Sequence, residues 1–261
     1  MDALLLLGLA ALFGSLVGSF LNVVILRLPL EGSSIAYPAS HCPQCGYVLR
    51  WYDNIPIFSY LLLRGKCRQC KQHISMQYPL VELLMAALSA LLMHQFGLSF
   101  VFLLYFLFAA ALLVIIFIDI HHQIIPDCIS LPGIVIGFIG SFINPSVTWF
   151  QSALGILCGG GILFALAFSY QLLAKREGMG GGDVKLLAMI GAFLGIQSLL
   201  FVIFFSSLTG SIIGIGAMVY QKKGGQTRIP FGPFLSLAAL VYLFFQNEIL
   251  SLWQMYLTLF T

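Results

Sequence analysis

Charged residues are scarce in this chain. Only 8% of its 261 residues are charged, whereas an average soluble domain carries about 25%, and 60% are hydrophobic. A soluble globular fold is therefore excluded. The apolar segments also lack the roughly ten-residue alternation of the strands in a membrane β-barrel. They run for roughly 15 to 27 residues, the length of membrane-spanning helices, so we predict an all-α integral membrane protein.

Eight apolar segments are candidates for transmembrane helices. They are residues 3–26, 79–96, 100–119, 128–143, 150–174, 184–197, 199–220 and 232–247. Residues 248–260 either extend the last span or lie in the membrane interface. The rest of the chain forms short connections and one large hydrophilic segment, so about eight spans are expected.

Basic residues are missing from every second connection between these spans. The connections around Gln95, Pro145 and Gln197 contain no Lys or Arg, and all 12 basic residues fall in the other connections or, for Lys185, at the edge of one. Loops rich in Lys and Arg face the cytoplasm. We therefore expect both termini outside and the basic loops inside. The first span lacks a basic leader and a small-x-small exit site, so we interpret it as an anchor rather than a cleaved signal peptide.

Four of the six cysteines form two C-x-x-C pairs, 21 residues apart. These are Cys42, Cys45, Cys67 and Cys70. Four thiolates on two such turns suit tetrahedral zinc, and Gly46 supplies a tight turn after the first pair. The pairs fall in the hydrophilic segment 28–78, which we expect in the reducing cytoplasm, where a metal is favoured over disulfides. A structural zinc ion would stabilise a segment too short to have a core of its own.

This segment divides the chain into three parts. They are an N-terminal transmembrane helix (1–27), a cytoplasmic four-cysteine domain (28–78) inserted between the first two spans, and a transmembrane region (79–261). Redox-active dithiols and a segment without metal are the alternatives to zinc. His41 and His73 flank the cysteines, and we expect them at the surface rather than as ligands. Small residues at four-residue spacing predict close helix packing: Gly14/Gly18, Gly133/Gly137, Gly191/Gly195 and Gly210/Gly214.

Two aspartates at the ends of apolar runs are candidate catalytic residues. Asp119 ends the run from Leu103 to Ile118, and Asp183 follows the glycine-rich stretch 178–182. Both fall in predicted cytoplasmic turns, at similar depth. A carboxylate at a membrane boundary is costly to desolvate, so it needs a compensating role. Two carboxyl groups about 3 Å apart share a proton, and such a pair activates water to attack a peptide carbonyl.

The same aspartates have a simpler interpretation as helix caps or partners of nearby cations. Asp127 follows Pro126 and fits an N-cap of the fourth span. Lys185 is close enough in sequence to pair with an aspartate. The glycines before Asp183 permit unusual backbone angles and close approach of a substrate backbone. A nucleotide site is not indicated, because a P-loop requires Gly-Lys-Ser/Thr where this chain has Asp-Val-Lys.

Several motifs together resemble those of the bacterial type IV prepilin peptidases. The sequence GMGGGDVKLLAMIGAFLG, which contains Gly180 to Asp183, resembles the family's G-x-G-D block. The run FIDIHHQIIPD resembles its first-aspartate block. GSFLNVVILRLP, the two C-x-x-C pairs and YPLVE resemble its N-terminal region, in the same order. The resemblance covers nearly the whole chain and is specific as a set, whereas G-x-G-D alone is shared with presenilin-like proteases.

This resemblance implies an aspartic-type endopeptidase of the inner membrane. Such enzymes remove the short basic leader of type IV prepilins and pseudopilins at the cytoplasmic face, cutting after a glycine. Many then N-methylate the new N-terminal residue, often phenylalanine, with S-adenosylmethionine. The expected partners are these substrates and membrane lipid, with no nucleic acid. Carried over, the catalytic pair is Asp119 and Asp183, the supporting residues are Asp127, Gly180, Gly182 and Lys185, and the zinc ligands are Cys42, Cys45, Cys67 and Cys70.

The methyltransferase half has no recognisable sequence motif, since no glycine-rich turn follows a strand. We place the methyl-donor site at the cytoplasmic face near the four-cysteine domain. Cytoplasmic acids could attract a basic leader, although solvation at the interface is the simpler role for each. They are Glu31, Asp53, Glu82 and Glu177.

Three other functions are open to such a chain. Presenilin-like G-x-G-D proteases carry a tyrosine before the first aspartate, where this chain has Ile118, and a Pro-Ala-Leu run where it has Pro-Phe-Gly-Pro. A transporter with acidic gating residues would place them near the bilayer midplane rather than at span edges. A thiol oxidoreductase would need its cysteines on the oxidising side, against the distribution of basic residues.

Overall fold

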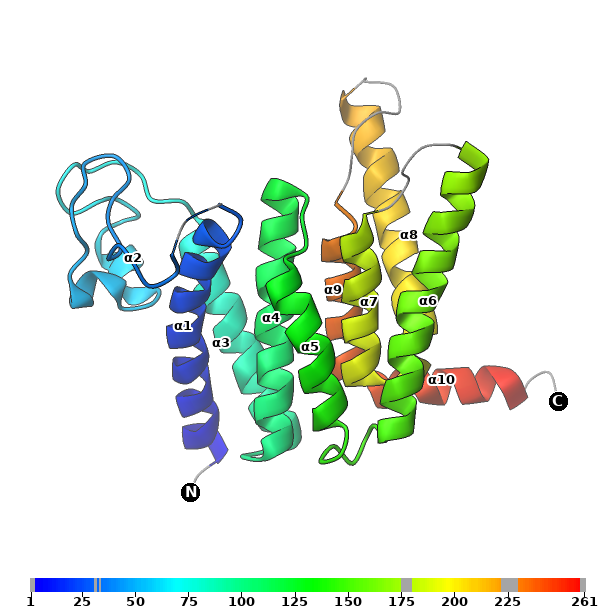
Figure 1. The fold of residues 1–261 in the computed structure, drawn as a ribbon. Helices are drawn as coiled ribbons and strands as arrows, with labels where there is room; N and C mark the ends of the chain where they lie inside the picture. Colours follow the sequence, from blue (N-terminus) through cyan, green and yellow to red (C-terminus); the bar gives the residue numbers. More distant parts are fainter. Residues whose placement is uncertain (1–2, 31, 33, 175–179, 222–229, 259–261) are drawn as a thin grey trace. The chain divides into compact units, whose positions relative to one another are not determined.

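The computed structural model describes residues 3–30, 32, 34–174, 180–221 and 230–258. Within these ranges the chain is helical and contains no β-strand (Figure 1). The longer helices are α1 (Ala3–Arg27), α3 (Gln77–Phe96), α4 (Phe100–His122), α5 (Asp127–Gly140), α6 (Trp149–Ala174), α7 (Gly181–Leu194), α8 (Ile196–Gln221), α9 (Gly232–Phe244) and α10 (Gln246–Thr258). A short 3-10 helix, η1 (Trp51–Asn54), and α2 (Phe58–Leu62) lie between α1 and α3.

The chain divides into two compact units, Met1–Ile118 and Asp119–Thr261. In the first unit, α1 packs along α3 (Figure 1). A Cβ atom on Gly14 would collide with Met85 and Ser89 of α3, and one on Gly18 would collide with the backbone of Glu82. The Ser89 hydroxyl donates a hydrogen bond of 2.7 Å to the carbonyl of Ala10. The predicted close packing through Gly14 and Gly18 is confirmed.

The second unit is built around α7. This helix is buried from Leu186 to Leu194 and contacts α5, α6, α8 and α9. Gly155 of α6 faces Gly191 of α7 so closely that neither position has room for a side chain. The Ser152 hydroxyl also donates 2.7 Å to the carbonyl of Ala192. The helix that carries Asp183 at its start is therefore held firmly within this unit.

Five helices of the described ranges are long and apolar enough to cross a membrane: α1, α3, α4, and parts of α6 and α8. The number rises to six if α9 and α10, which meet at a bend of 86°, count as one broken span. The prediction of eight spans is therefore not confirmed, although each predicted segment contains a helix. Two of these helices, α5 and α7, have 14 residues each. At 1.5 Å per residue they reach about 21 Å, short of a hydrocarbon core of about 30 Å.

The bend before α10 bears on whether residues 248–260 extend the last span or lie in the membrane interface. An extension of the last span would continue the axis of α9, whereas the axis turns by 86°. Residues 248–258 therefore do not continue the axis of α9, and residues 259 and 260 lie outside the described residues.

Candidate active site and metal centre

Asp119 lies in the last turn of α4 rather than in a connecting turn as expected. The helix continues to His122, and α5 begins at Asp127, so the connection is only four residues long. The Asp119 side chain is buried, with 5% of the residue exposed. Its Oδ2 accepts a hydrogen bond of 2.9 Å from the backbone N–H of Gly232. That N–H is one of the unpaired donors at the start of α9, which makes it available to the carboxylate.

Asp183 lies in the first turn of α7. The glycine stretch before it was expected to be a loop, but the helix already begins at Gly181, with Gly180 as its N-cap residue. The backbone N–H of Asp183 donates 3.2 Å to the carbonyl of Gly180. A helix N-terminus favours negative charge through its free N–H groups and the aligned peptide dipoles. Asp183 is half-buried in this turn, and among the described residues its carboxyl group accepts no hydrogen bond, unlike that of Asp119.

Ile125 connects the starts of α7 and α9. A Cβ atom on Gly182 would collide with the side chain of Ile125, and a Cβ atom on Gly232 would meet both Ile125 and the carboxyl group of Asp119. Gly182, the residue before Asp183, and the Asp119 carboxyl group therefore lie in the surroundings of the same Ile125 side chain. The two aspartates are thus brought into one site, while their role as a catalytic pair stays a prediction.

Asp127 does not cap α5 through its side chain, so that interpretation is wrong. The N-cap position belongs to Pro126, and no side-chain cap is present. Both carboxylate oxygens of Asp127 instead lie 2.7 Å from Nζ of Lys185. This ion pair joins the first turns of α5 and α7, and both side chains remain partly exposed to solvent. With its two oxygens engaged, Asp127 is poorly placed to act as a third catalytic acid.

The four predicted zinc ligands converge. Their sulfur atoms all lie within 4.8 Å of one another, with Cys42 and Cys70 3.8 Å apart and Cys45 and Cys67 3.9 Å apart. Disulfide sulfurs would be about 2.05 Å apart. A tetrahedron with Zn–S bonds of about 2.3 Å has edges of about 3.8 Å, so the spacing fits zinc. The flanking His41 and His73 are exposed and do not belong to this cluster.

The two cysteine pairs adopt matching turns. The N–H of Gly46 donates to the carbonyl of Cys42, and the N–H of Lys71 donates to that of Cys67. Gly46 has φ of 70° and Lys71 has φ of 60°, so both turns end in the left-handed region. The sequence predicted this turn at Gly46. It gave no sign of the second, because Lys71 adopts a conformation that is usually left to glycine.

The thiols of the cluster cannot all ionise without a cation. Hydrogen bonds from the backbones of Cys70 and Gln69 lower the pKa of Cys67 to about 7. At Cys70 a backbone hydrogen bond from Gln72 acts in the same direction, but burial and the other three thiols raise its pKa to about 11. A divalent metal removes this conflict, because it stabilises all four thiolates at once. The donor set therefore fits a bound zinc ion.

Asp53 was a candidate for attracting a basic leader, but its carboxylate is already engaged. It is buried and accepts hydrogen bonds from Nε of Arg68 at 2.8 Å, the Tyr47 hydroxyl at 3.1 Å and the N–H of Arg50 at 3.2 Å. Burial by itself would raise the pKa of Asp53, but these hydrogen bonds outweigh it and lower the pKa. Asp53 thus braces the four-cysteine segment.

Of the other acids expected to attract a leader, Glu82 is withdrawn from the surface and two lie outside the described residues. Glu82 is buried, with 7% of the residue exposed, and its Oε2 accepts 2.7 Å from the N–H of Ile57. Glu31 and Glu177 lie outside the described residues. Electrostatic attraction of a leader thus finds no support among the acids that the structure describes.

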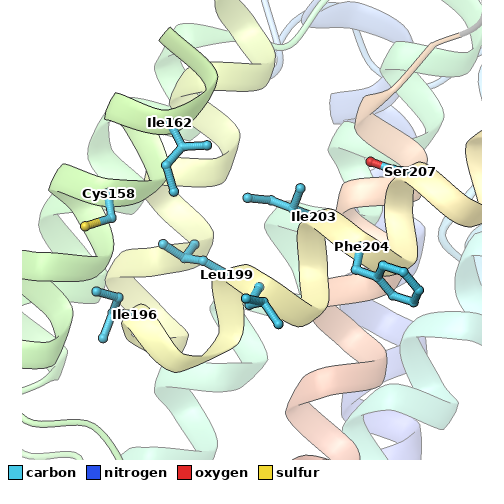
Figure 2. Close-up of a pocket in the computed structure, with 8 residues that line it drawn as sticks. Cys158, Ile162, Ile196, Leu199, Ile203, Phe204 and Ser207 are labelled. Carbon is cyan, nitrogen blue, oxygen red and sulfur yellow. The ribbon is translucent and has the colours of Figure 1, made fainter. Parts of the chain in front are cut away.

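Two cavities in the described residues differ in the groups that line them. A cavity of about 970 Å³ lies in the first unit, where α1 and α3 meet the four-cysteine segment, and it is lined by both polar and apolar side chains. The other, about 600 Å³, lies between α6 and α8 and is almost wholly apolar (Figure 2). Its only polar lining groups are the Ser207 hydroxyl and the Cys158 thiol. Only the first cavity offers charged groups for chemistry.

Two protein-family models match the chain. The bacterial peptidase A24 N-terminal domain covers residues 12–96, and the type IV leader peptidase family covers residues 106–215. This chain belongs to the type IV leader peptidase family. The first match contains the four-cysteine segment, and the second contains both Asp119 and Asp183.

Several curated proteins are similar over nearly their whole length. The chain is 36% identical to the prepilin leader peptidase/N-methyltransferase of Pseudomonas putida over 262 residues, covering 92% of this chain and 91% of the relative. It is 38% identical to that of Stutzerimonas stutzeri, with the same coverage, and 38% identical to that of Neisseria gonorrhoeae, covering 94% and 92%. No solved structure gives a significant match. The resemblance to type IV prepilin peptidases that the motifs indicated is thus confirmed.

Three residues near the aspartate site and the larger cavity were not identified from the sequence. Gly232 and Ile125 contact each other beside Asp119, and Asn22 lines the larger cavity. The Pro-Phe-Gly-Pro run around Gly232 was the one available signal, since a glycine between prolines at a helix start marks a tight approach.

Proposed function

We propose that this protein is a membrane aspartic endopeptidase that removes the basic leader of type IV prepilins or pseudopilins and then N-methylates the new N-terminus. The observation that supports the peptidase most directly is the convergence of Asp119 and Asp183 around Ile125 and Gly232. The printed names of the similar proteins support both activities. The distribution of basic residues supports cleavage at the cytoplasmic face of the inner membrane, with both termini outside.

The hydrogen bond to Asp119 suggests how the two carboxyl groups divide the work. An N–H donor favours a carboxylate over a carboxylic acid, so we assign the ionised role to Asp119, which Gly232 contacts. Asp119 takes a proton from the attacking water, while protonated Asp183 donates to the developing oxyanion and later to the leaving amine. No covalent intermediate forms. The Asp127–Lys185 ion pair supports this geometry by holding the first turns of α5 and α7 together.

The four cysteines have a structural role in this scheme. Bound zinc would hold the two turns of the 28–78 segment, which has few buried side chains of its own. The cavity beside this segment is the proposed site of methyl transfer, where S-adenosylmethionine would supply an activated methyl group. A basic leader followed by an apolar helix suits a site of this kind, because the helix stays in lipid while its scissile bond lies at the interface.

Purified protein in detergent, mixed with a prepilin, tests the peptidase directly. We expect a shortened product, and we expect folded but inactive Asp119→Asn and Asp183→Asn variants. Asp127→Asn is the comparison variant: it weakens the supporting ion pair to Lys185 but leaves both carboxyl groups of the proposed pair, so we expect it to slow cleavage far less than either of them. Cleavage by Asp119→Asn at the normal rate would refute the proposal. A transporter with acidic gating residues would then be the main alternative.

The metal centre needs a separate measurement. Cys42→Ser is expected to lose zinc, measured by elemental analysis, and to lower the melting temperature of the protein. Structural zinc does not take part in bond cleavage, so protein that remains folded should still cut the prepilin. A variant that keeps its fold and metal but loses cleavage would point to a chemical role for the thiols instead.

A further inference from the structure

Asn22 lines the larger cavity and has an unused acceptor. The residue is buried, with 1% exposed, and it lines this cavity from α1. Its amide nitrogen donates to the carbonyl of Tyr78 at 3.1 Å and to that of Gly18 at 3.3 Å. These two acceptors fix the orientation of the amide, because the oxygen could not take the nitrogen's place. Oδ1 is left without a hydrogen-bond partner.

A buried amide oxygen without a partner costs roughly 1–3 kcal/mol. Each such group in a native structure calls for an explanation, such as a catalytic role, a bound water or ion, or a ligand. The oxygen of Asn22 can only accept a hydrogen bond. The missing partner must therefore be a donor, and the cavity must admit it.

Glu82 lines the same cavity from α3, one helical turn after Tyr78. Its carboxylate accepts from the N–H of Ile57 and has the Ser19 hydroxyl as a further partner. Both are neutral donors. The structure records no salt bridge to Glu82 within the described ranges, where the only two ion pairs are Arg68–Asp53 and Lys185–Asp127. A buried carboxylate without a counter-ion is well suited to a cationic ligand.

The remaining charged groups around the cavity leave this end acidic. Arg68 and Asp53 neutralise each other, and Arg27 donates to the carbonyls of Ser34 and Pro38. His41 and His73, which also line the cavity, belong to the four-cysteine segment and are exposed. The end formed by Asn22 and Glu82 thus presents two oxygen acceptors and one negative charge, which together select an amine.

We propose that Asn22 and Glu82 bind the free N-terminal amino group of the cleaved pilin and position it for methylation. This inference rests on the proposed function, whose first step creates that amine. The amino group enters as an ammonium ion, donates to Oδ1 of Asn22 and loses one proton to Glu82. The nitrogen lone pair then attacks the methyl carbon of a sulfonium donor. The carbon–sulfur bond breaks, its electron pair stays on sulfur as a neutral thioether, and Glu82 later releases its proton to water.

The first test compares two variants with a matched control. Glu82→Gln keeps an acceptor for Ile57 but removes the charge, and Asn22→Leu removes the unused oxygen at similar volume. Ser15→Ala is the control, because Ser15 is a buried polar residue of α1 that bonds within its own helix and does not line the cavity. We expect methyl transfer to a synthetic peptide with a free N-terminal phenylalanine to fall about 100-fold or more in Glu82→Gln. Cleavage of prepilin should stay within twofold in all three variants.

The second test does not depend on methyl transfer or on how the variants fold. Binding of the free-amine peptide and of its N-acetylated form to the wild-type protein in detergent is measured by calorimetry, without a methyl donor. We expect acetylation to weaken binding at least tenfold, since the acetylated nitrogen carries no charge. Equal binding of the two peptides overturns the inference. Normal methylation by folded Glu82→Gln also overturns it, whereas failure of the wild-type protein to cleave any prepilin would refute the proposed function instead.

Discussion

Gly232 offers the sharpest test of the aspartate site. Adding one carbon atom there, as in Gly232→Ala, should disturb the Asp119 carboxyl group and slow cleavage while changing the stability of the fold little. A Cβ atom at this position would lie 2.6 Å from Oδ2 of Asp119 and 3.2 Å from Cδ1 of Ile125. Ordinary carbon–oxygen contacts begin at about 3.4 Å. Gly232→Ala must therefore displace the carboxylate by about 0.8 Å or rotate it away from the Gly232 N–H.

The cost of this displacement falls on catalysis. Misplacing a reacting group by about 1 Å can lower a rate about 100-fold, which corresponds to about 2.7 kcal/mol in the activation free energy. The fold should tolerate the change, because the displaced atom is the end of a side chain and alanine suits the first turn of a helix. We therefore expect Gly232→Ala to cleave prepilin about 100-fold more slowly, with a melting temperature close to wild type.

Cleavage of a purified prepilin, followed over time on gels, measures the effect. Gly161→Ala serves as the control, since a Cβ there meets nothing within 4 Å. Methylation of a pre-cut peptide should be unchanged in both variants, because the proposed methylation site lies in the other unit. A Gly232→Ala protein that is folded and cleaves at the wild-type rate would show that the position of the Asp119 carboxylate does not limit the reaction.

Three further predictions concern the surroundings of the two sites. Lys71→Gly should raise the unfolding free energy by about 1 kcal/mol, measured by chemical denaturation, because it relieves a left-handed backbone; an unchanged or lower value contradicts this. Removing the exposed Asp127–Lys185 ion pair with Lys185→Met should cost less than about 1 kcal/mol of stability in the same assay and be weaker still in high salt. Asp53→Asn should lower the melting temperature, and the deficit should stay constant from about pH 8 to pH 5. Because the pKa of Asp53 is lowered in the folded protein, its contribution to stability is fully present above the unfolded pKa of about 3.9 and is lost only as the pH falls below that value. A deficit that vanishes near pH 6 would therefore refute the assignment.

The sequence predicted what depends on local composition. Each of the eight apolar segments contains a helix, and the four cysteines converge as their spacing indicated. The glycine pair in α1 packs against α3, because small residues at four-residue spacing form one smooth helix face. Helix ends were less predictable. Asp119 was expected in a turn because it interrupts an apolar run, but one charge near a helix terminus does not end the helix.

Contacts distant in sequence could not be predicted. Gly232 is 113 residues from Asp119, and no local pattern connects a backbone N–H to a distant carboxylate. Asp127 was interpreted as a cap because local rules consider only neighbouring residues, whereas its partner Lys185 is 58 residues away. The unpaired oxygen of Asn22 likewise depends on Tyr78, which belongs to another helix. Such properties arise from tertiary packing alone.

The pairing of α1 with α3 has a consequence for how the protein is made. These helices flank residues 28–76, so they can join as a hairpin once the ribosome has synthesised the first hundred or so residues. Their union brings the two ends of the intervening loop together before the C-terminal half enters the bilayer. The four thiols would then come together on a loop whose two ends the α1–α3 pair already holds. Cells starved of zinc during translation should therefore accumulate an inserted protein whose loop between α1 and α3 is unfolded and open to proteolysis, rather than a chain that fails to enter the membrane.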